Sequence, residues 1–299
     1  MKFLRFILSM SSRNGAIRAV YLAFALSTLS CATVSRFNIL TTQQEIEIGR
    51  ETAREIEREI EIYDDPVVSA YIDSLGQVLV RHSRRPGVKY SFKVVDTDQV
   101  NAFALPGGWL YINRGLITTA ENEAELAGVI GHEIGHVVGK HGARQITKQY
   151  GLAVLVELAV GGENPSLARK IAGQFAAMGA GLTLLKYGRD AEREADYFAV
   201  EETYAAGINP EGMATFFEKL MAQQESKQES KQLWARGWFS THPASRERIA
   251  NVREQIAELP PKAGLKKDSK RFQEIKSRIL KKDKTRSGET KLRETFRAF

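Results

Sequence analysis

The stretch HEIGH, residues 132–136, lies in a run whose apolar spacing predicts a helix from residue 120 onward. On a helix, residues four apart differ by only about 40° around the axis, so His132 and His136 point to one spot and can share a metal ion. Glu133 lies about 100° away and reaches a metal-bound water as a general base must. Such a pentapeptide arises by chance on the order of once in a hundred chains of this length. The motif therefore favours a zinc peptidase without establishing one.

A catalytic zinc takes three protein ligands, so a third ligand must be sought elsewhere in the sequence. His141 is one candidate, but a continuing helix would turn it about 140° away from the ligand face, which predicts a helix-end histidine. Glu192, in the EREAD stretch of residues 192–196, is the better candidate. Asp196 lies four residues later on the same face and is placed to accept a hydrogen bond from a ligand imidazole. The alternative for EREAD is a charged helix surface, which we would prefer if the upstream motif were absent.

The remaining chain alternates helical periodicity with one cluster of β-formers. A Pro-Gly-Gly turn at 106–108 between two β-like runs predicts a hairpin. We therefore expect an α+β fold that is mainly helical, with a small β-sheet or hairpin beside the H-E-x-x-H helix. The expected helices cover residues 43–62, 66–83, 120–136, 151–160, 191–206 and 210–224, and the expected strands cover 90–95, 100–105 and 109–112.

Several motifs together resemble peptidase family M48, the family of HtpX and the CAAX prenyl proteases, which are gluzincin metalloendopeptidases. They are HEIGH at 132–136, Glu-x-x-Ala-Asp at 192–196, Thr-His-Pro at 241–243, and Arg248 six residues after that histidine. The segment NAFALPGGWLYINRGLI, residues 101–117, is similar to the segment before the zinc helix in the soluble periplasmic branch of the family. Motifs at these separations are far more specific than H-E-x-x-H alone.

The resemblance covers roughly residues 42–280 and implies a zincin-type metallopeptidase fold that binds one Zn²⁺. It leaves open whether His242 stabilises the oxyanion or silences the zinc. The implied roles are zinc binding for His132, His136 and Glu192, general base for Glu133, and support of the site for His242, Asp196 and Arg248.

The expected strand at 100–105 would lie along the cleft and pair with an extended substrate, reading mainly its backbone. Such a cleft accepts unfolded segments more readily than folded proteins. We therefore expect an exported endopeptidase that hydrolyses unfolded, damaged or misassembled envelope proteins. The alternative is a chaperone-like envelope assembly factor that binds unfolded clients and whose proteolysis is latent. The residues expected to contact substrate are Asn101, Ala102, Phe103 and Ala104.

Composition excludes several other classes of protein. With 299 residues, 43% of them hydrophobic, and mean hydropathy −0.30, the chain is globular and not a multi-pass membrane protein. A single cysteine excludes a disulfide framework and a cysteine-ligated structural zinc. The net charge of +7 comes from residues 262–299, where 14 Lys and Arg against 5 Asp and Glu give +9 and leave −2 for the rest. We therefore expect no nucleic-acid partner; the tail is either solvated or attached to an acidic membrane surface.

The amino terminus has the pattern of a secretory signal. Basic residues precede an uncharged run at 19–29, which ends in small residues around Cys31 and is too short to span a bilayer comfortably. Cys31 stands where a lipoprotein signal places its lipidated cysteine, although Thr28 replaces the usual leucine. Ordinary cleavage is the alternative, and both predict export to the periplasm, with membrane attachment in the first case. The expected regions are a signal at 1–31, a metallopeptidase domain at 37–260 and a basic tail at 261–299, whose first part packs as the domain's last helix.

Overall fold

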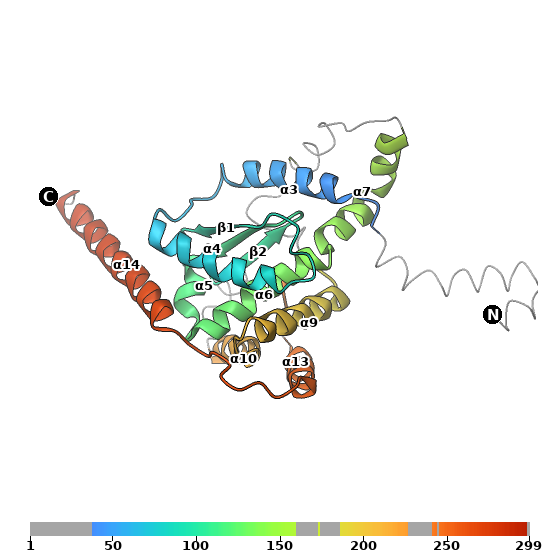
Figure 1. Cartoon of the computed structure of the whole chain (residues 1–299). Helices are drawn as coiled ribbons and strands as arrows, with labels where there is room; N and C mark the ends of the chain where they lie inside the picture. Colours follow the sequence, from blue (N-terminus) through green and yellow to red (C-terminus); the bar gives the residue numbers. More distant parts are fainter. Residues whose placement is uncertain (1–37, 160–172, 174–185, 227–240, 244, 298–299) are drawn as a thin grey trace, which may run out of the picture.

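The computed structural model describes residues 38–159, 173, 186–226, 241–243 and 245–297, so the expected signal and Cys31 lie outside the described part. Helices surround a small central sheet (Figure 1). The predicted α+β, mainly helical fold is thus confirmed. The elements are α3 (Thr42–Ile56), α4 (Pro66–Arg81), β1 (Ser91–Val95), β2 (Ala102–Leu105), β3 (Trp109–Asn113), α5 (Arg114–Thr119), α6 (Glu123–Val138), α7 (His141–Ala159), α9 (Arg189–Ala205), α10 (Glu211–Ser226), α13 (Arg246–Glu258) and α14 (Lys270–Arg297).

The sheet has the strand order β1-β3-β2, with β1 parallel and β2 antiparallel to β3. The predicted hairpin joins β2 to β3 through the Pro-Gly-Gly turn. Gly107 and Gly108 have φ angles of +75° and +103°, a conformation that residues with a Cβ rarely adopt. This order leaves β2 at an edge of the sheet.

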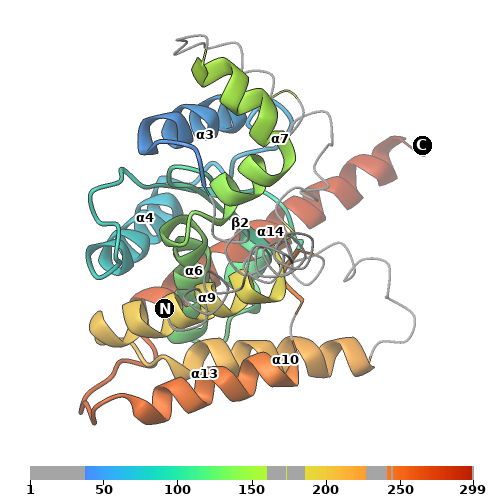
Figure 2. The same ribbon diagram turned by 90° about the vertical axis from the view of Figure 1, so that its right-hand side faces the viewer.

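Each face of the sheet packs against different helices because side chains alternate along the strands. Ala104 and Leu110 belong to the larger core, which the sheet shares with α4 and α6. Phe103 and Tyr111 face the opposite way, into a second core with α3 and the start of α7. On the far side of α6 from the sheet, α9 and then α10 and α13 follow, the last two running side by side (Figure 2).

Helix α6 is buried along nearly its whole length, from residue 123 to residue 137. Its amino end is capped by the Asn122 side chain, which accepts a hydrogen bond from the Glu125 N–H. A helix enclosed on all sides can hold polar side chains only where they have partners. The motif at 132–136 therefore sits in the interior, where it meets other polar groups.

The first helix is shorter than its periodicity predicts, because α3 ends at Ile56 rather than near residue 62. A capping box at Thr41 begins it. Residues 57–59 form a turn, after which Ile62 forms an antiparallel bridge with Val95 of β1. Ile60, at the end of the turn that follows the helix, and Ile62 pack against the core beneath α3.

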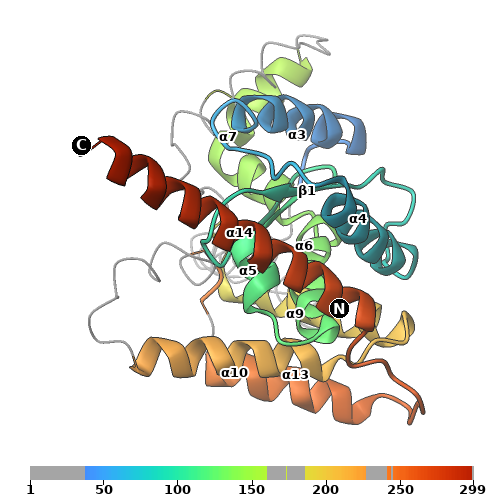
Figure 3. The ribbon, with the colours of Figure 1, turned by 90° about the vertical axis from the view of Figure 1, so that its left-hand side faces the viewer.

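The basic tail contains α14, which packs through its first turns and then runs past the body of the molecule (Figure 3). Phe272, Ile275 and Ile279 are its buried apolar residues and lie in the larger core. None of the helices in the described part combines the length and apolar character needed to cross a bilayer.

Candidate metal centre

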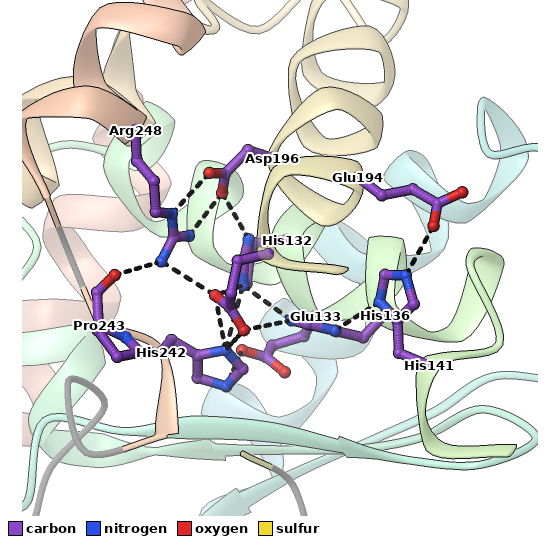
Figure 4. A network of polar contacts seen from close by, with 10 residues as sticks. His132, Glu133, His136, His141, Glu194, Asp196, His242, Pro243 and Arg248 are labelled. Carbon is purple, nitrogen blue, oxygen red and sulfur yellow. Dashed lines mark hydrogen bonds and ion pairs between the residues drawn. The ribbon is translucent and has the colours of Figure 1, made fainter. Parts of the chain in front are cut away.

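Four buried side chains from three separate segments bring their donor atoms together. His132 and His136 come from α6, Glu192 from the first turn of α9, and His242 from the segment before α13. Their donor atoms all lie within 4.8 Å of one another. Figure 4 shows His132, His136 and His242 converging between the two helices and the sheet. Within the described residues this is the group suited to hold a metal ion.

Close packing of α6 on α9 explains why these segments meet. A Cβ on Gly135 would lie 2.7 Å from the Ala195 carbonyl oxygen, and one on Gly131 would lie 3.3 Å from the Ala199 Cα. The backbones approach this closely because one helix contributes glycine and the other alanine at the crossing. The contact carries Glu192 to the motif histidines.

The spacing of the predicted ligands fits a tetrahedral zinc site. The His132 and His136 Nε2 atoms are 3.0 Å apart. The Glu192 oxygens lie 3.5 Å from His132 Nε2 and 3.6 Å from His136 Nε2. Zinc bonds of about 2.0–2.1 Å at tetrahedral angles place two donors about 3.3 Å apart. Two imidazoles and one carboxylate are also a donor set that zinc accepts.

Asp196 orients His132 as expected. It accepts a hydrogen bond from His132 Nδ1 at 2.8 Å, which leaves Nε2 of that ring to face the other donors. Arg248 holds Asp196 through two hydrogen bonds of 2.7 Å and donates a third, of 2.9 Å, to the Pro243 carbonyl. Burial raises the pKa of Asp196, but the charge of Arg248 outweighs it and the net pKa is lowered. A fourth guanidinium contact, 2.9 Å from Glu192, ties Arg248 to the expected ligand as well.

Glu133 lies beside this donor group without belonging to it. The side chain is 2% exposed, and its Oε1 is 3.5 Å from His242 Nε2. The other ring nitrogen, His242 Nδ1, is 3.1 Å from Glu192 Oε1 and 3.3 Å from His132 Nε2. His242 therefore stands between the expected base and the expected ligands, and its Nδ1 has the spacing of a fourth donor.

The edge strand β2 is buried along its length. The predicted substrate-contacting residues, Asn101 to Ala104, are each at most 5% exposed, backbone included. The Asn113 N–H donates to the Asn101 carbonyl at 3.0 Å, which fixes the alternation of the ladder. Phe103 continues the hydrogen-bonded positions, so Ala102 and Ala104 direct their N–H and C=O groups away from β3.

Three side chains at the site were missed by the sequence reasoning. His141, expected only as a helix-end residue, begins α7 and lies 2.8 Å from His136, Nδ1 to Nδ1. Glu194 lies 3.0 Å from His141 Nε2. The hydrogen bond from His141, opposed by burial and aided by Arg144, lowers the pKa of Glu194 to about 2. In the sequence, the only sign of these contacts is the histidine that follows five residues after His136.

Tyr187 is the third of these residues, and its ring stacks on His136 with 4.2 Å between centroids and 23° between planes. Burial, with the nearby Glu133 and Glu192, raises the pKa of Tyr187, which keeps its hydroxyl neutral. An aromatic residue five positions before Glu192 gives no distinctive pattern in one sequence.

Comparison with known proteins agrees with this geometry. The family model for peptidase family M48 matches residues 66–256. The chain is 31% identical over 239 residues to the beta-barrel assembly-enhancing protease of Escherichia coli K12, covering 78% of this chain and 48% of that protein. It is 32% identical over 173 residues to the metalloprotease YcaL of the same organism, covering 57% of this chain and 64% of YcaL. It is 26% identical over 235 residues to the mitochondrial metalloendopeptidase OMA1 of Schizosaccharomyces pombe, covering 76% of this chain and 65% of that protein.

The chain thus spans about half the length of the assembly-enhancing protease that it matches. The matched region contains all four donors and extends from the start of α4 to near the end of α13. The motifs, the zincin-like arrangement and the family model agree, and the chain belongs to peptidase family M48, a family of metal-dependent peptidases.

Proposed function

We propose that the protein is a zinc-dependent metalloendopeptidase with one Zn²⁺ held by His132, His136 and Glu192. The observation that carries this proposal is the spacing of their donor atoms, 3.0 to 3.6 Å, beside a carboxylate that is not a ligand. Zinc, when bound, lowers the pKa of a coordinated water and polarises the scissile carbonyl.

The chain's own residues then manage protons and charge. Glu133 accepts the proton of the attacking water and returns it to the leaving amine nitrogen. His242, close to Glu133, donates to the oxygen that becomes negative during attack. Arg248 keeps Asp196 ionised and positioned, so that His132 retains a proton on Nδ1.

The proposed substrates are extended segments of unfolded, damaged or misassembled envelope proteins. The backbone groups of Ala102 and Ala104 point away from β3, and such a segment would add there as a further strand once it gains access to this buried edge. Backbone pairing requires an extended chain and little particular sequence. The name of the assembly-enhancing relative supports an envelope substrate, and the signal-like residues 1–31 support export to the periplasm, with lipid attachment at Cys31.

One observation favours a second candidate, a client-binding assembly factor with latent proteolysis. His242 Nδ1 lies at donor spacing from both His132 and Glu192. As a fourth ligand it would fill the position that a catalytic zinc keeps open for water. In that state the β2 edge would hold clients while the site remained silent.

The test is cleavage of an unfolded model protein by the zinc-loaded full chain, compared with Glu133→Gln. We expect the substitution to retain zinc and to lower the rate about a hundredfold or more, since general acid-base groups contribute at least that much. Equal cleavage by both proteins would remove Glu133 from its role. If neither cleaves while zinc is bound, and His242→Ala restores cleavage, the latent form is the correct one.

A further inference from the structure

The second motif histidine is joined to a chain of polar side chains that leads away from the metal site. His136 Nδ1 lies 2.8 Å from His141 Nδ1, and the other nitrogen of His141 lies 3.0 Å from Glu194 Oε2. Arg144 holds the same carboxylate oxygen at 2.8 Å. Figure 4 shows His141 between His136 and Glu194, on the side of His136 away from Asp196.

The chemistry of these groups fixes the direction of each hydrogen bond. An ionised carboxylate only accepts, so His141 Nε2 carries the proton toward Glu194. The Nδ1 of neutral His141 is then an acceptor, and His136 must donate from its own Nδ1. His136 Nε2 is left with its lone pair, and this atom is the one that faces His132 and Glu192.

The backbone is shaped to bring His141 to this place. Lys140 has φ +55°, a left-handed conformation that residues with a Cβ rarely adopt. This turn ends α6 and directs the first residue of α7 back against His136. A Cβ on Gly139 would overlap the His141 ring, so the glycine makes room for it. Unfavourable backbone geometry that persists next to a site points to a function for it.

The arrangement around His136 matches that around His132. Each metal-facing imidazole is linked to a carboxylate on α9 that an arginine holds. His132 contacts its carboxylate, Asp196, directly, whereas His136 reaches Glu194 through His141. We propose that His141 is a positioning residue, which with Glu194 fixes the tautomer and ring orientation of His136. The inference rests on the proposed metal site.

The geometry also excludes His141 as a ligand in its own right. Both of its ring nitrogens are engaged, one by His136 and the other by Glu194, so neither faces the donor group. Tyr187 stacks flat on His136 and restrains its tilt. Stacking does not choose between the two ring flips, so the hydrogen bond to His141 makes that choice.

The experiment measures zinc affinity of the full chain by competition with a chromogenic chelator, and the absorption spectrum of the Co²⁺-substituted protein. His141→Ala should weaken zinc binding by about 10- to 100-fold, as loss of a ligand's outer hydrogen bond typically does, and change the Co²⁺ spectrum. His141→Asn, whose side-chain oxygen can accept from His136, should recover most of the affinity. His82→Ala removes the exposed histidine at the end of α4 and is the matched control.

Further variants separate positioning from folding. Glu194, whose side chain is 31% exposed, can become Gln without leaving a cavity, and Glu194→Gln should weaken zinc binding less than His141→Ala. If Glu194 acts on His136 through His141, adding Glu194→Gln to His141→Ala causes little further loss of zinc affinity. Wild-type affinity and spectrum in His141→Ala, or additive losses in the double variant, would overturn the inference. Failure of the wild type to bind zinc would instead refute the metal site itself.

Discussion

At the scale of single residues, the helix crossing at Gly135 leaves little room for a larger side chain. Its absent Cβ would lie 2.7 Å from the Ala195 carbonyl oxygen, and backbone cannot move aside as a side chain can. We expect Gly135→Ala to lower the free energy of unfolding by about 1–3 kcal/mol, the usual effect of overpacking. It should also weaken zinc binding, because α9 carries Glu192. Urea denaturation checks the first effect and chelator competition the second.

Gly87→Ala is the control, because nothing lies within 4 Å of a Cβ at that position. Its unfolding free energy should stay within about 0.5 kcal/mol of the wild type. Equal stability of the two variants would show that α6 and α9 can separate without cost.

Glu202 makes stability depend on pH. Its side chain is 2% exposed, and neither carboxylate oxygen has a hydrogen-bond partner among the described residues. Burial, with the nearby Glu201, raises the pKa of Glu202 well above 4.5. A raised folded-state pKa means that stability is full below pH 4.5 and falls as the pH rises toward the folded value.

Glu202→Met should therefore stabilise the protein at pH 8 by about 1–3 kcal/mol and have a smaller effect at pH 4.5. Urea unfolding at the two pH values measures the difference. Glu254→Gln, on the exposed side of α13, is the control and should change neither value appreciably. A Glu202 variant as pH-dependent as the wild type would assign that dependence to other groups.

The shared helix faces of the proposed ligand residues could be predicted because spacing on a helix is fixed by the backbone. Residues 132 and 136, and 192 and 196, share a face in any α-helix. The contact of His141 with His136 could not be predicted in this way. The prediction assumed a continuing helix, whereas Lys140 adopts φ +55° and reverses the chain. No propensity scale anticipates a left-handed lysine.

At the scale of elements, proline substitutions in the edge strand β2 can distinguish an effect on substrate binding from an effect on folding. The Ala104 N–H points away from β3, whereas that of Phe103 lies on the hydrogen-bonded side of the hairpin. Ala104→Pro should thus leave the hairpin paired, since proline is tolerated at a sheet edge, and should weaken binding or cleavage of an unfolded protein about tenfold. Steady-state kinetics, with KM and kcat resolved, is the measurement.

Phe103→Pro is the contrasting variant, because it removes a ladder hydrogen bond inside the hairpin and should destabilise the fold. Substrate handling by Ala104→Pro equal to that of the wild type would mean that substrates do not add to this edge.

The hairpin and most helices could be predicted from local patterns, but the order of the strands and the length of α3 could not. β1 pairs with β3 in parallel, a contact between segments that no turn connects directly. The apolar residues after Ile56 keep helical spacing in the sequence. The helix nevertheless ends, because Ile62 pairs with Val95 and packs against the core beneath α3. Tertiary packing overrides local preference at both places.

At the scale of the whole molecule, metal removal should loosen the fold. A ligand present at about 1,000 times its Kd stabilises the folded state by about 4 kcal/mol. For a domain of this size, removal of the metal by a chelator should therefore lower the Tm by about 10 °C. Differential scanning fluorimetry with and without chelator measures the shift. Glu192→Ala should show little shift, and an equal shift in that variant would indicate that the metal binds elsewhere.

The donor group draws together parts of the chain that are far apart in sequence, since His132 and His242 are 110 residues apart. An ion shared between them acts as a removable cross-link and restricts the unfolded chain as a disulfide does. The same metal concentration would then set both the enzyme's activity and its own resistance to digestion. Under the proposed function, molecules that lack the metal would unfold more often and be cleaved by metal-loaded copies of the same protein. Inactive molecules would thus be removed by the active ones.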